Sequence, residues 1–210
     1  NARQKIEELL QEAGLVRNKR AISHAVNVHE RCKKPIEYVV LNQWFLNVLE
    51  NKQQFLNAAD TIAWHPTFMK ARFRDWVENL QWDWCLSRQR FYGIPFPAWH
   101  CKSCGHVIIA SEEQLPIDPQ ETAYEGKCPQ CNSTDIKGDT DVMDTWNTSS
   151  LTPYICAQLA DRTMQNPLTE AVEKKFLPMA MRPQAHDIIR TWAFYTLVKT
   201  WLHNKTIPWK

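Results

Sequence analysis

Residues Trp82–Cys104 read WDWCLSRQRFYGIPFPAWHCKSC and combine aromatic side chains, two arginines and a cysteine pair. Aromatic residues this dense are costly to leave in water, so most of the run is expected to be buried or to hold a ligand. Gly93, Pro95 and Pro97 are incompatible with a helix. The chain should therefore be extended or turning as it reaches Cys101.

The basic and polar residues Arg88, Gln89 and Arg90 lie in the middle of this run. Charged side chains among buried aromatics need partners. Two interpretations are open from these residues alone. One is a core strand whose arginines pair with carboxylates, and the other is a strand that faces a polyanion.

The composition is that of a globular protein. Of its residues, 44% are hydrophobic and 23% are charged. With a length of 210 residues, the chain can bury a sizeable core. Its net charge of +2 gives no global basic field, so a nucleic-acid surface would be a local patch. No membrane-length apolar run and no signal peptide are seen, which predicts a cytosolic (cytoplasmic) protein without a membrane partner.

Two Cys-x-x-Cys pairs are separated by residues 105–127. In a cytosolic protein such pairs indicate metal ligation in preference to disulfides. Four thiolates at this spacing fit a structural tetrahedral zinc, which would hold residues 98–138 as a small ribbon. Redox use of the pairs is the minority alternative, and His100 and His106 are possible substitute ligands. The predicted ligands are Cys101, Cys104, Cys128 and Cys131.

Other polar and sulfur groups carry weaker signals. His29 and Cys32 form a lone pair that is more often incidental than metal-binding. Cys85 and Cys156 are expected to be small buried hydrophobes. Three carboxylates within residues 139–153, which follow the cysteine ribbon, fit either a cation site or ordinary caps and turns. These are Asp139, Asp141 and Asp144.

Periodicity predicts the remaining elements. We expect an amphipathic helix over 3–13, two strands around a turn over 23–40, a helix from Gln43 through Ala58, a turn at His65-Pro66 and a helix over 67–80. Beyond these, we expect a helix with a loop over 161–176, then a strand up to Pro183 and a helix to His203. The chain begins inside a helical pattern and ends on the approach to a strand, which suggests a piece of a larger protein.

Six segments, in the same order, resemble class I aminoacyl-tRNA synthetases of the branch that activates valine, isoleucine and leucine. They are the predicted strand pair with Cys32, Gln43-Trp44-Phe45, DWCLSRQRFYGIP, the four-cysteine knuckles, DTWNTSS and RPQAHDIIRTW. Within the branch the chain is most similar to the valyl-tRNA synthetases, because Ile188 stands where isoleucyl enzymes more often carry Gln. An isoleucyl or leucyl enzyme remains an alternative.

The resemblance implies an α/β fold, namely the second half of a Rossmann-like parallel-sheet catalytic domain with an inserted zinc ribbon. It divides the chain into the end of an editing-insertion stem (1–40), a return into the catalytic domain (41–97), the zinc ribbon (98–138) and the second half of the nucleotide-binding domain (139–210). It also implies that His29 and Cys32 are half of a second zinc site whose other ligands lie upstream.

The implied activity is valine–tRNA ligation. The whole enzyme would activate valine with ATP and Mg²⁺ and transfer it to the acceptor end of tRNA(Val), with no DNA partner. The His-x-Gly-His and Lys-Met-Ser-Lys-Ser signatures of the family are not found here, so no catalytic residue is assigned and this piece alone is expected to be inactive.

The resemblance also implies binding residues. Trp146 and Trp192 would wall the valine side chain, whereas Asp187 and the backbone near Gln184 would face the adenylate ribose. The same segment contains Ile188 and Ala185, and Ala185 replaces a more usual Gly. Family members often carry Phe where this chain has Asn147. Phosphates of the tRNA acceptor stem would contact Arg88, Arg90 and Gln89.

A different class of function also fits the residues. A stand-alone zinc-ribbon adaptor for nucleic acid would explain the four cysteines, the Arg-Gln-Arg cluster and the tryptophan content. It would bind RNA tightly by itself, with a marked salt dependence.

Overall fold

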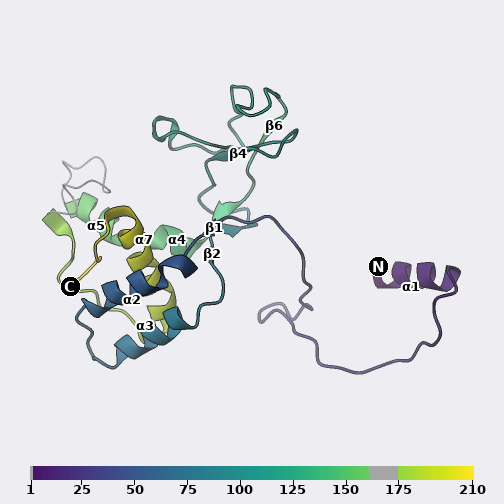
Figure 1. Cartoon of the computed structure of the whole chain (residues 1–210), viewed down its shortest axis with the longest axis horizontal. Coiled ribbons are helices and arrows are strands. Elements are labelled where there is room, and N and C mark those ends of the chain that lie inside the picture. The colour runs from purple at the N-terminus through teal and green to yellow at the C-terminus, as the bar shows by residue number, and fades with distance from the viewer. Residues whose placement is uncertain (1, 161–174) are drawn as a thin grey trace. The chain divides into compact units, whose positions relative to one another are not determined.

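The computed structural model describes residues 2–160 and 175–210 (Figure 1). The chain divides into two compact units, Asn1–Asn42 and Gln43–Lys210, which are described separately below. No helix among the described residues has the length and apolar character needed to cross a membrane.

The first unit contains one helix, α1 (Ala2–Glu12), as the sequence predicts. Its apolar stripe is exposed, with 59% of Ile6 accessible to solvent. The prediction of two strands over 23–40 is wrong, since the segment forms a turn closed by a single antiparallel bridge between Val28 and Pro35. An isolated hairpin without a third strand or a helix to pack on is only marginally stable, which accounts for the failure.

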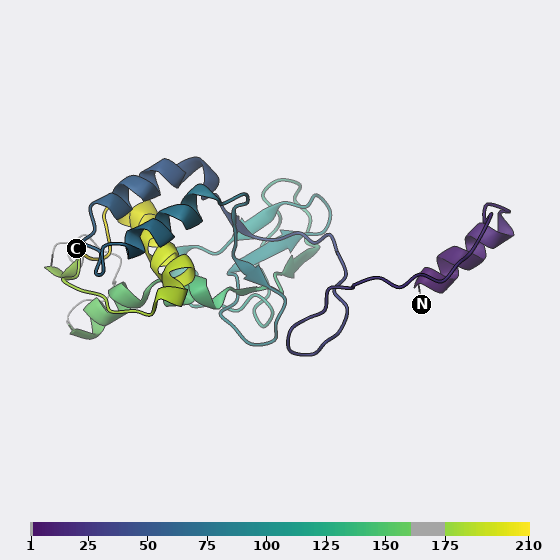
Figure 2. The ribbon, with the colours of Figure 1, turned by 90° about the horizontal axis from the view of Figure 1, so that it is seen from below.

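The core of the second unit is a packed group of helices. They are a short 3-10 helix η1 (Leu49–Asn51), α2 (Lys52–Asp60), α3 (Met69–Glu78) and α7 (Phe194–Asn204). Figure 2 shows α2, α3 and α7 packed together. The ring of Phe194 lies 6.2 Å from Phe55 of α2 and 6.0 Å from Phe73 of α3, and all three side chains are buried. The predicted helix over 67–80 is confirmed in α3.

The predicted helix from Gln43 begins later than expected. Phe45–Leu46 form a short strand, β1, paired antiparallel with β2 (Trp84–Cys85). The amide of Trp44 donates to Ser87 Oγ at 2.9 Å, and its carbonyl accepts from the amide of Leu86 at 2.8 Å. Tertiary pairing with the Trp82–Cys104 run therefore overrides helical propensity here.

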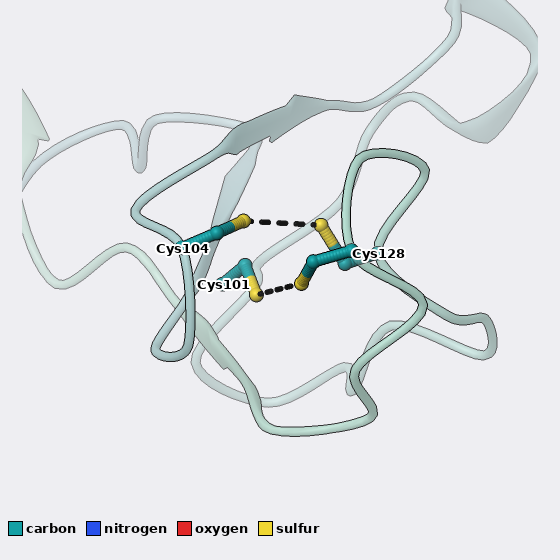
Figure 3. Close-up of side chains that lie close together, drawn as sticks. Cys101, Cys104 and Cys128 are labelled. Carbon is teal, nitrogen blue, oxygen red and sulfur yellow. Dashed lines mark hydrogen bonds between the residues drawn. The ribbon is translucent and has the colours of Figure 1, made fainter.

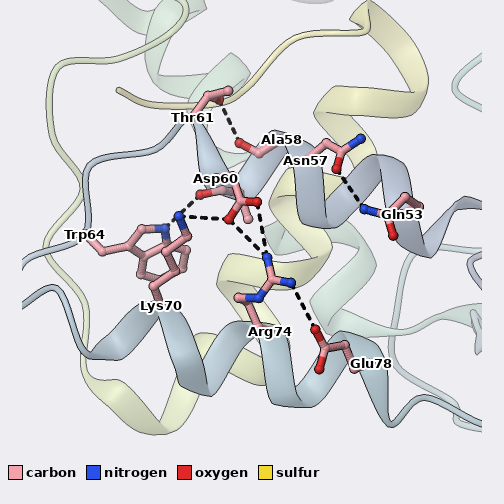
Figure 4. A network of polar contacts seen from close by, with 10 residues as sticks. Gln53, Asn57, Ala58, Asp60, Thr61, Trp64, Lys70, Arg74 and Glu78 are labelled. Carbon is pink, nitrogen blue, oxygen red and sulfur yellow. Dashed lines mark hydrogen bonds and ion pairs between the residues drawn. The ribbon is translucent and has the colours of Figure 1, made fainter.

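Ion pairs tie α2 to α3 (Figure 4). Lys70 and Arg74 of α3 approach the carboxylate of Asp60 at 2.8 and 3.1 Å, and Arg74 also contacts Glu78 at 3.1 Å. The hydrogen bond from Lys70 and the nearby positive charges lower the pKa of Asp60, although burial opposes this. Because these groups are largely exposed, the network orients the helices more than it stabilises them.

The C-terminal region departs from the predicted strand and helix. Of the strand expected up to Pro183, only a parallel bridge from Met179 to Trp209 is formed. The chain then forms a 3-10 turn, η3 (His186–Ile188), and a π-helical turn, η4 (Ile189–Ala193), before α7. Another helix, α5 (Thr152–Ala160), precedes residues 161–174, so most of the helix and loop predicted over 161–176 lies outside the described residues.

The strands pair into small antiparallel sheets. One joins β3 (Ser87–Arg88) to β7 (Val142–Met143), and another has the order β5 (Val107–Ile109), β4 (Ala98–Cys101), β6 (Ile136–Gly138). Gly138 permits close packing in this sheet, because a Cβ there would lie 1.9 Å from the carbonyl oxygen of Pro119. Within the described residues, the only parallel pairing is the bridge noted above, so the parallel nucleotide-binding sheet stays a prediction.

Candidate functional site

Both cysteine pairs adopt the same local turn. Each pair forms a knuckle that begins at its first cysteine. The residue directly after the second cysteine has a positive φ, and these residues are Gly105 (φ 75°) and Asn132 (φ 58°). The amide of Gly105 donates to the Cys101 carbonyl at 2.9 Å, and the amide of Asn132 donates to the Cys128 carbonyl at 2.8 Å. Gly and Asn are the residues that adopt the left-handed conformation most readily, so the sequence itself encodes both turns.

The two knuckles bring the four sulfur atoms together (Figure 3). The Sγ atoms of Cys101 and Cys131 lie 3.5 Å apart, those of Cys104 and Cys128 lie 3.6 Å apart, and all four lie within 4.8 Å of one another. Four sulfurs at tetrahedral corners around one zinc would be about 3.8 Å apart. The cluster that the sequence predicts is therefore formed, and its donor set is compatible with zinc.

The sulfurs differ in how readily they ionise. Burial opposes ionisation of Cys101, but the amides of Cys104 and Ser103 lower its pKa to about 6. The amide of His106 favours the Cys104 thiolate, yet burial and the neighbouring sulfurs raise its pKa to about 12. Ionising all four clustered thiols together therefore requires a cation that neutralises the thiolates.

A buried carboxylate joins this ribbon to the rest of the second unit. Asp139 Oδ2 accepts from Trp44 Nε1 at 2.7 Å and lies 2.9 Å from His100 Nε2, while its Oδ1 accepts from the amide of Asp141 at 2.8 Å. Sequence reasoning did not find this network, because Trp44 is 95 residues away from Asp139. The ring of Trp44 also stacks on Phe96, with 5.2 Å between centroids.

These contacts predict an acid dependence. Burial acts to raise the pKa of Asp139, but the hydrogen bonds from His100, Asp141 and Trp44 outweigh it and lower the pKa below 3.8. The stabilisation is therefore present above pH 3.8 and is lost as the pH falls through the lowered pKa. We expect Asp139→Asn to cost about 1.5–3 kcal/mol of local stability at neutral pH and nothing in strong acid.

The measurement is hydrogen exchange of peptides containing Trp44 and His100 in the full-length protein, corrected for the intrinsic pH dependence of exchange. Glu121→Gln, which removes an exposed carboxylate, is the control. Equal protection of the Asp139→Asn variant and the parent at neutral pH would contradict the prediction.

A second buried carboxylate, Asp144, precedes the five-residue helix α4 (Thr145–Ser149). Its Oδ2 accepts from Trp84 Nε1 at 3.3 Å and lies 3.4 Å from Arg88 Nη2. Arg88 Nη1 donates to the carbonyls of Cys85 and Ser87 at 2.9 and 2.7 Å. Arg88 is thus paired with a buried carboxylate of the same chain, as the core-strand interpretation of the sequence expects.

The neighbouring residues of the basic cluster face outward. Arg90 is exposed, and Gln89 Nε2 donates to Asp141 Oδ2 at 2.9 Å. The aromatic side chains beside them are not buried as the sequence suggested, since Phe91 is 99% and Tyr92 88% exposed. Of the three residues predicted to contact tRNA, Arg90 is the one whose charge is presented to solvent.

The two tryptophans predicted to wall the amino-acid site differ in surroundings. Trp192 is buried, stacks on Trp209 at 5.4 Å between ring centroids, and lies 4.1 Å from the guanidinium of Arg182. Its Nε1 donates to the carbonyl of Ser149 at 3.1 Å. Trp146 of α4 is only partly buried and packs against the same core. Trp146 thus lies in α4, and Trp192 lies in η4 and donates to the last residue of α4.

The residues predicted to face the adenylate lie around η3. Gln184 and Ala185 line a cavity of about 850 Å³ whose other walls include Trp64, His65 and Arg182. The Oε1 atom of Gln184 is buried and has no hydrogen-bond partner among residues 2–160 and 175–210, which leaves an acceptor available to a ligand. Two further members of the predicted set, Asp187 (exposed) and Ile188 (partly buried), are not among the residues that line this cavity.

The remaining candidates from the sequence are the carboxylates after the cysteine ribbon, two isolated cysteines, and the pair of His29 and Cys32. Asp139 and Asp144 bond to tryptophan, histidine and arginine, which makes a cation site between them unnecessary. Cys156 is exposed, so its prediction as a buried residue is wrong, and Cys85 is half-buried. His29 Nδ1 lies 3.4 Å from Cys32 Sγ in the turn of the first unit, and both residues are exposed.

Comparison with known proteins identifies the family. Residues 7–210 match the model of tRNA synthetases class I (I, L, M and V). The whole chain is 44% identical to the valine–tRNA ligase of Thermoplasma acidophilum over 210 residues, and 41% identical to that of Rickettsia felis over 214 residues. It covers 25% and 24% of those relatives, so it spans about a quarter of their length. By this match, which includes nearly every residue, the chain belongs to the class I tRNA synthetases of the I, L, M and V group.

Proposed function

We propose that the protein to which this chain belongs activates valine with ATP and Mg²⁺ and transfers it to tRNA(Val) in the cytoplasm. The observation that carries the proposal is the match of the entire chain to valine–tRNA ligases at 40–44% identity. A stand-alone zinc-ribbon adaptor is less well supported, because the family match extends over residues 7–210 and is not confined to the ribbon.

We assign this chain to the second half of a Rossmann-like catalytic domain. The bridge from Met179 to Trp209 supports the assignment, because two parallel segments joined by a helix, here α7, form the basic unit of such a sheet. The amide of Met179 donates to Pro208 O at 3.0 Å, and that of Lys210 donates to Met179 O at 2.8 Å. Residues 1–40 would then end the editing-insertion stem, and residues 41–97 would return into the catalytic domain.

The ribbon over residues 98–138 would be an insert held by one structural zinc on the four cysteines. All four positions of a tetrahedral zinc are then filled by thiolates, and no site is left for a reacting water. The metal supplies folding free energy to a segment too polar to fold alone. The residues of the ribbon would therefore shape the catalytic domain without entering the chemistry.

The chemistry needs positioning and charge stabilisation. Activation is an in-line attack of the valine carboxylate on the α-phosphate of ATP, which releases pyrophosphate and forms the adenylate. We propose that Trp146 and Trp192 shape the valine pocket. The segment from Gln184 through Asp187 would face the adenylate ribose. No side chain of this chain is assigned to proton transfer or nucleophilic attack.

The test is aminoacylation by the full-length protein. With ATP, Mg²⁺ and tRNA(Val), we expect labelled valine to become attached to the 3′ end of the tRNA. The isolated 210-residue chain should attach none. Transfer of leucine or isoleucine to its own tRNA at a higher kcat/KM than valine to tRNA(Val) would overturn the assignment in favour of those enzymes.

The structure separates two arginines that the sequence treats alike. Arg90→Ala should weaken tRNA binding and lower the slope of log affinity against log salt concentration by about 1, because one phosphate contact is lost. Valine-dependent ATP–pyrophosphate exchange should be unchanged. Arg88→Ala should reduce exchange and transfer together, since it leaves the buried carboxylate of Asp144 without its cation.

Both variants are made in the full-length enzyme and assayed for exchange and for tRNA binding at several salt concentrations. A fall in exchange for Arg90→Ala as large as its fall in transfer would show that this residue belongs to the adenylate site or to the fold.

A further inference from the structure

The short helix α4 contains Trp146 and is held in place by side chains from other elements. At its start Asp144 bonds to Trp84 and Arg88, and near its end the Ser149 carbonyl accepts from Trp192. A five-residue helix cannot hold its own geometry in isolation. The position of the half-buried Trp146 ring therefore depends on the groups that anchor α4.

A further anchor comes from the amine of Lys199 in α7. Its Nζ donates to the side-chain oxygen of Asn147 at 2.8 Å, in the middle of α4. Burial lowers the pKa of Lys199, because removal from water disfavours the ammonium form. Within the described part of the chain no carboxylate pairs with Lys199. Its titratable neighbour is His203, one turn further along α7, whose pKa is lowered first by burial and then by the charge of Lys199.

Asn147 is built into the core. Its side chain is 5% exposed, and its Nδ2 donates to Met143 Sδ at 3.3 Å, so its Oδ1 faces Lys199. The Asn147 carbonyl accepts from Ser150 Oγ at 2.6 Å, which fixes the turn that follows α4. Loss of the amine would leave Oδ1 unpaired in a buried place, and loss of Oδ1 would leave a half-buried amine unpaired.

We propose that Lys199 and Asn147 form a positioning pair that fixes α4, and through it the Trp146 ring, against α7. The inference rests on the proposed function, because the importance of Trp146 comes from the valine pocket. Neither Lys199 nor Asn147 touches substrate in this account. They set the distance between α4 and α7, and a shift of about 1 Å in a positioning element is enough to lower the rate of the reaction.

The test uses the full-length enzyme with Lys199→Met, which keeps the apolar stem and removes the amine. The first readout is independent of function. Hydrogen exchange of residues 144–150 should quicken at least about tenfold, because α4 loses its middle anchor. The second readout is valine-dependent ATP–pyrophosphate exchange, in which the KM for valine should rise about tenfold. The KM for ATP should stay unchanged.

Lys52→Met is the matched control. Lys52 is also a partly buried lysine that donates to neutral acceptors, the carbonyls of Glu78 and Leu80, both at 2.8 Å. It ties α2 to the end of α3 and makes none of the contacts that anchor α4. This variant should lose comparable thermal stability, yet leave both the exchange of residues 144–150 and the valine KM unchanged.

Substitutions of Asn147 provide the second route and keep the test decisive if Lys199→Met does not fold. Asn147→Asp retains an acceptor of the same shape and should keep the valine KM near that of the parent. Asn147→Leu removes the acceptor and should behave like Lys199→Met, and the two losses should not add in the double variant.

The outcomes separate the two claims. If the parent enzyme shows no valine-dependent exchange, the proposed function fails, and the hydrogen exchange of residues 144–150 still decides whether the pair anchors α4. Unchanged protection of these residues in both Lys199→Met and Asn147→Leu would overturn the pair. A folded Lys199→Met enzyme with quickened exchange but an unaltered valine KM would overturn its link to the pocket.

Discussion

Replacing Cys128 with serine should abolish binding of the proposed zinc and unfold residues 98–138 while the helical core of the second unit stays folded. The Cys128 side chain is buried, and its sulfur lies 3.6 Å from that of Cys104. Structural zinc supplies on the order of 10 kcal/mol of folding free energy in zinc-finger peptides. The apolar side chains that the three-stranded sheet β5-β4-β6 buries are few, namely Ala98, Trp99 and Ile108, whereas the large buried cluster lies among the helices.

The measurement combines zinc content with hydrogen exchange of peptides from residues 98–138 in the full-length protein. We expect one zinc per chain in the parent and a loss of at least about 90% in Cys128→Ser. Cys156→Ser is the control, since this exposed cysteine lies outside the cluster. Parent protein that contains no stoichiometric zinc when reduced would contradict the assignment.

Replacing Trp192 with alanine should destabilise the helical core of the second unit by about 3–5 kcal/mol, the usual cost of deleting a large buried aromatic. Only 5% of the Trp192 surface is exposed, and its ring stacks on Trp209 at an interplanar angle of 14°. The variant also removes the donor to the Ser149 carbonyl. Denaturant unfolding monitored by hydrogen exchange of α7 would measure the loss.

Trp146→Ala is the informative comparison, because Trp146 is only partly buried. This variant should stay folded, raise the KM for valine and relax discrimination against larger side chains. If Trp192→Ala proves as stable as Trp146→Ala, the core role given to Trp192 is wrong. If Trp146→Ala leaves the valine KM and selectivity unchanged, Trp146 does not belong to the pocket.

Features that depend on local geometry could be predicted from the sequence. The four-cysteine cluster was found from its spacing, because each knuckle is a short turn that Gly105 or Asn132 closes within a few residues. The helices α1 and α3 were found from their apolar periodicity. In each knuckle and in each helix the interactions that form the element lie within a few positions of one another, whereas the two knuckles meet across 30 positions, from Cys101 to Cys131.

Features that depend on distant partners could not. The segment 23–40 has the composition of strands, but a strand needs a neighbour to pair with, and the structure gives it one bridge. Arg88 looked like a residue for phosphate contact because its partner, Asp144, is 56 positions further along the chain. The exposure of Cys156 and the pairing of Lys199 with Asn147 are likewise set by tertiary packing.

The most direct test of the account is amino-acid-dependent ATP–pyrophosphate exchange by the full-length protein, with valine, threonine, isoleucine and leucine compared at equal concentrations. We predict that valine gives the highest kcat/KM and that threonine, nearly the same shape, is about a hundredfold lower. Isoleucine and leucine should be excluded by their size. A higher kcat/KM for isoleucine or leucine, or exchange that does not depend on the amino acid, would contradict the proposal.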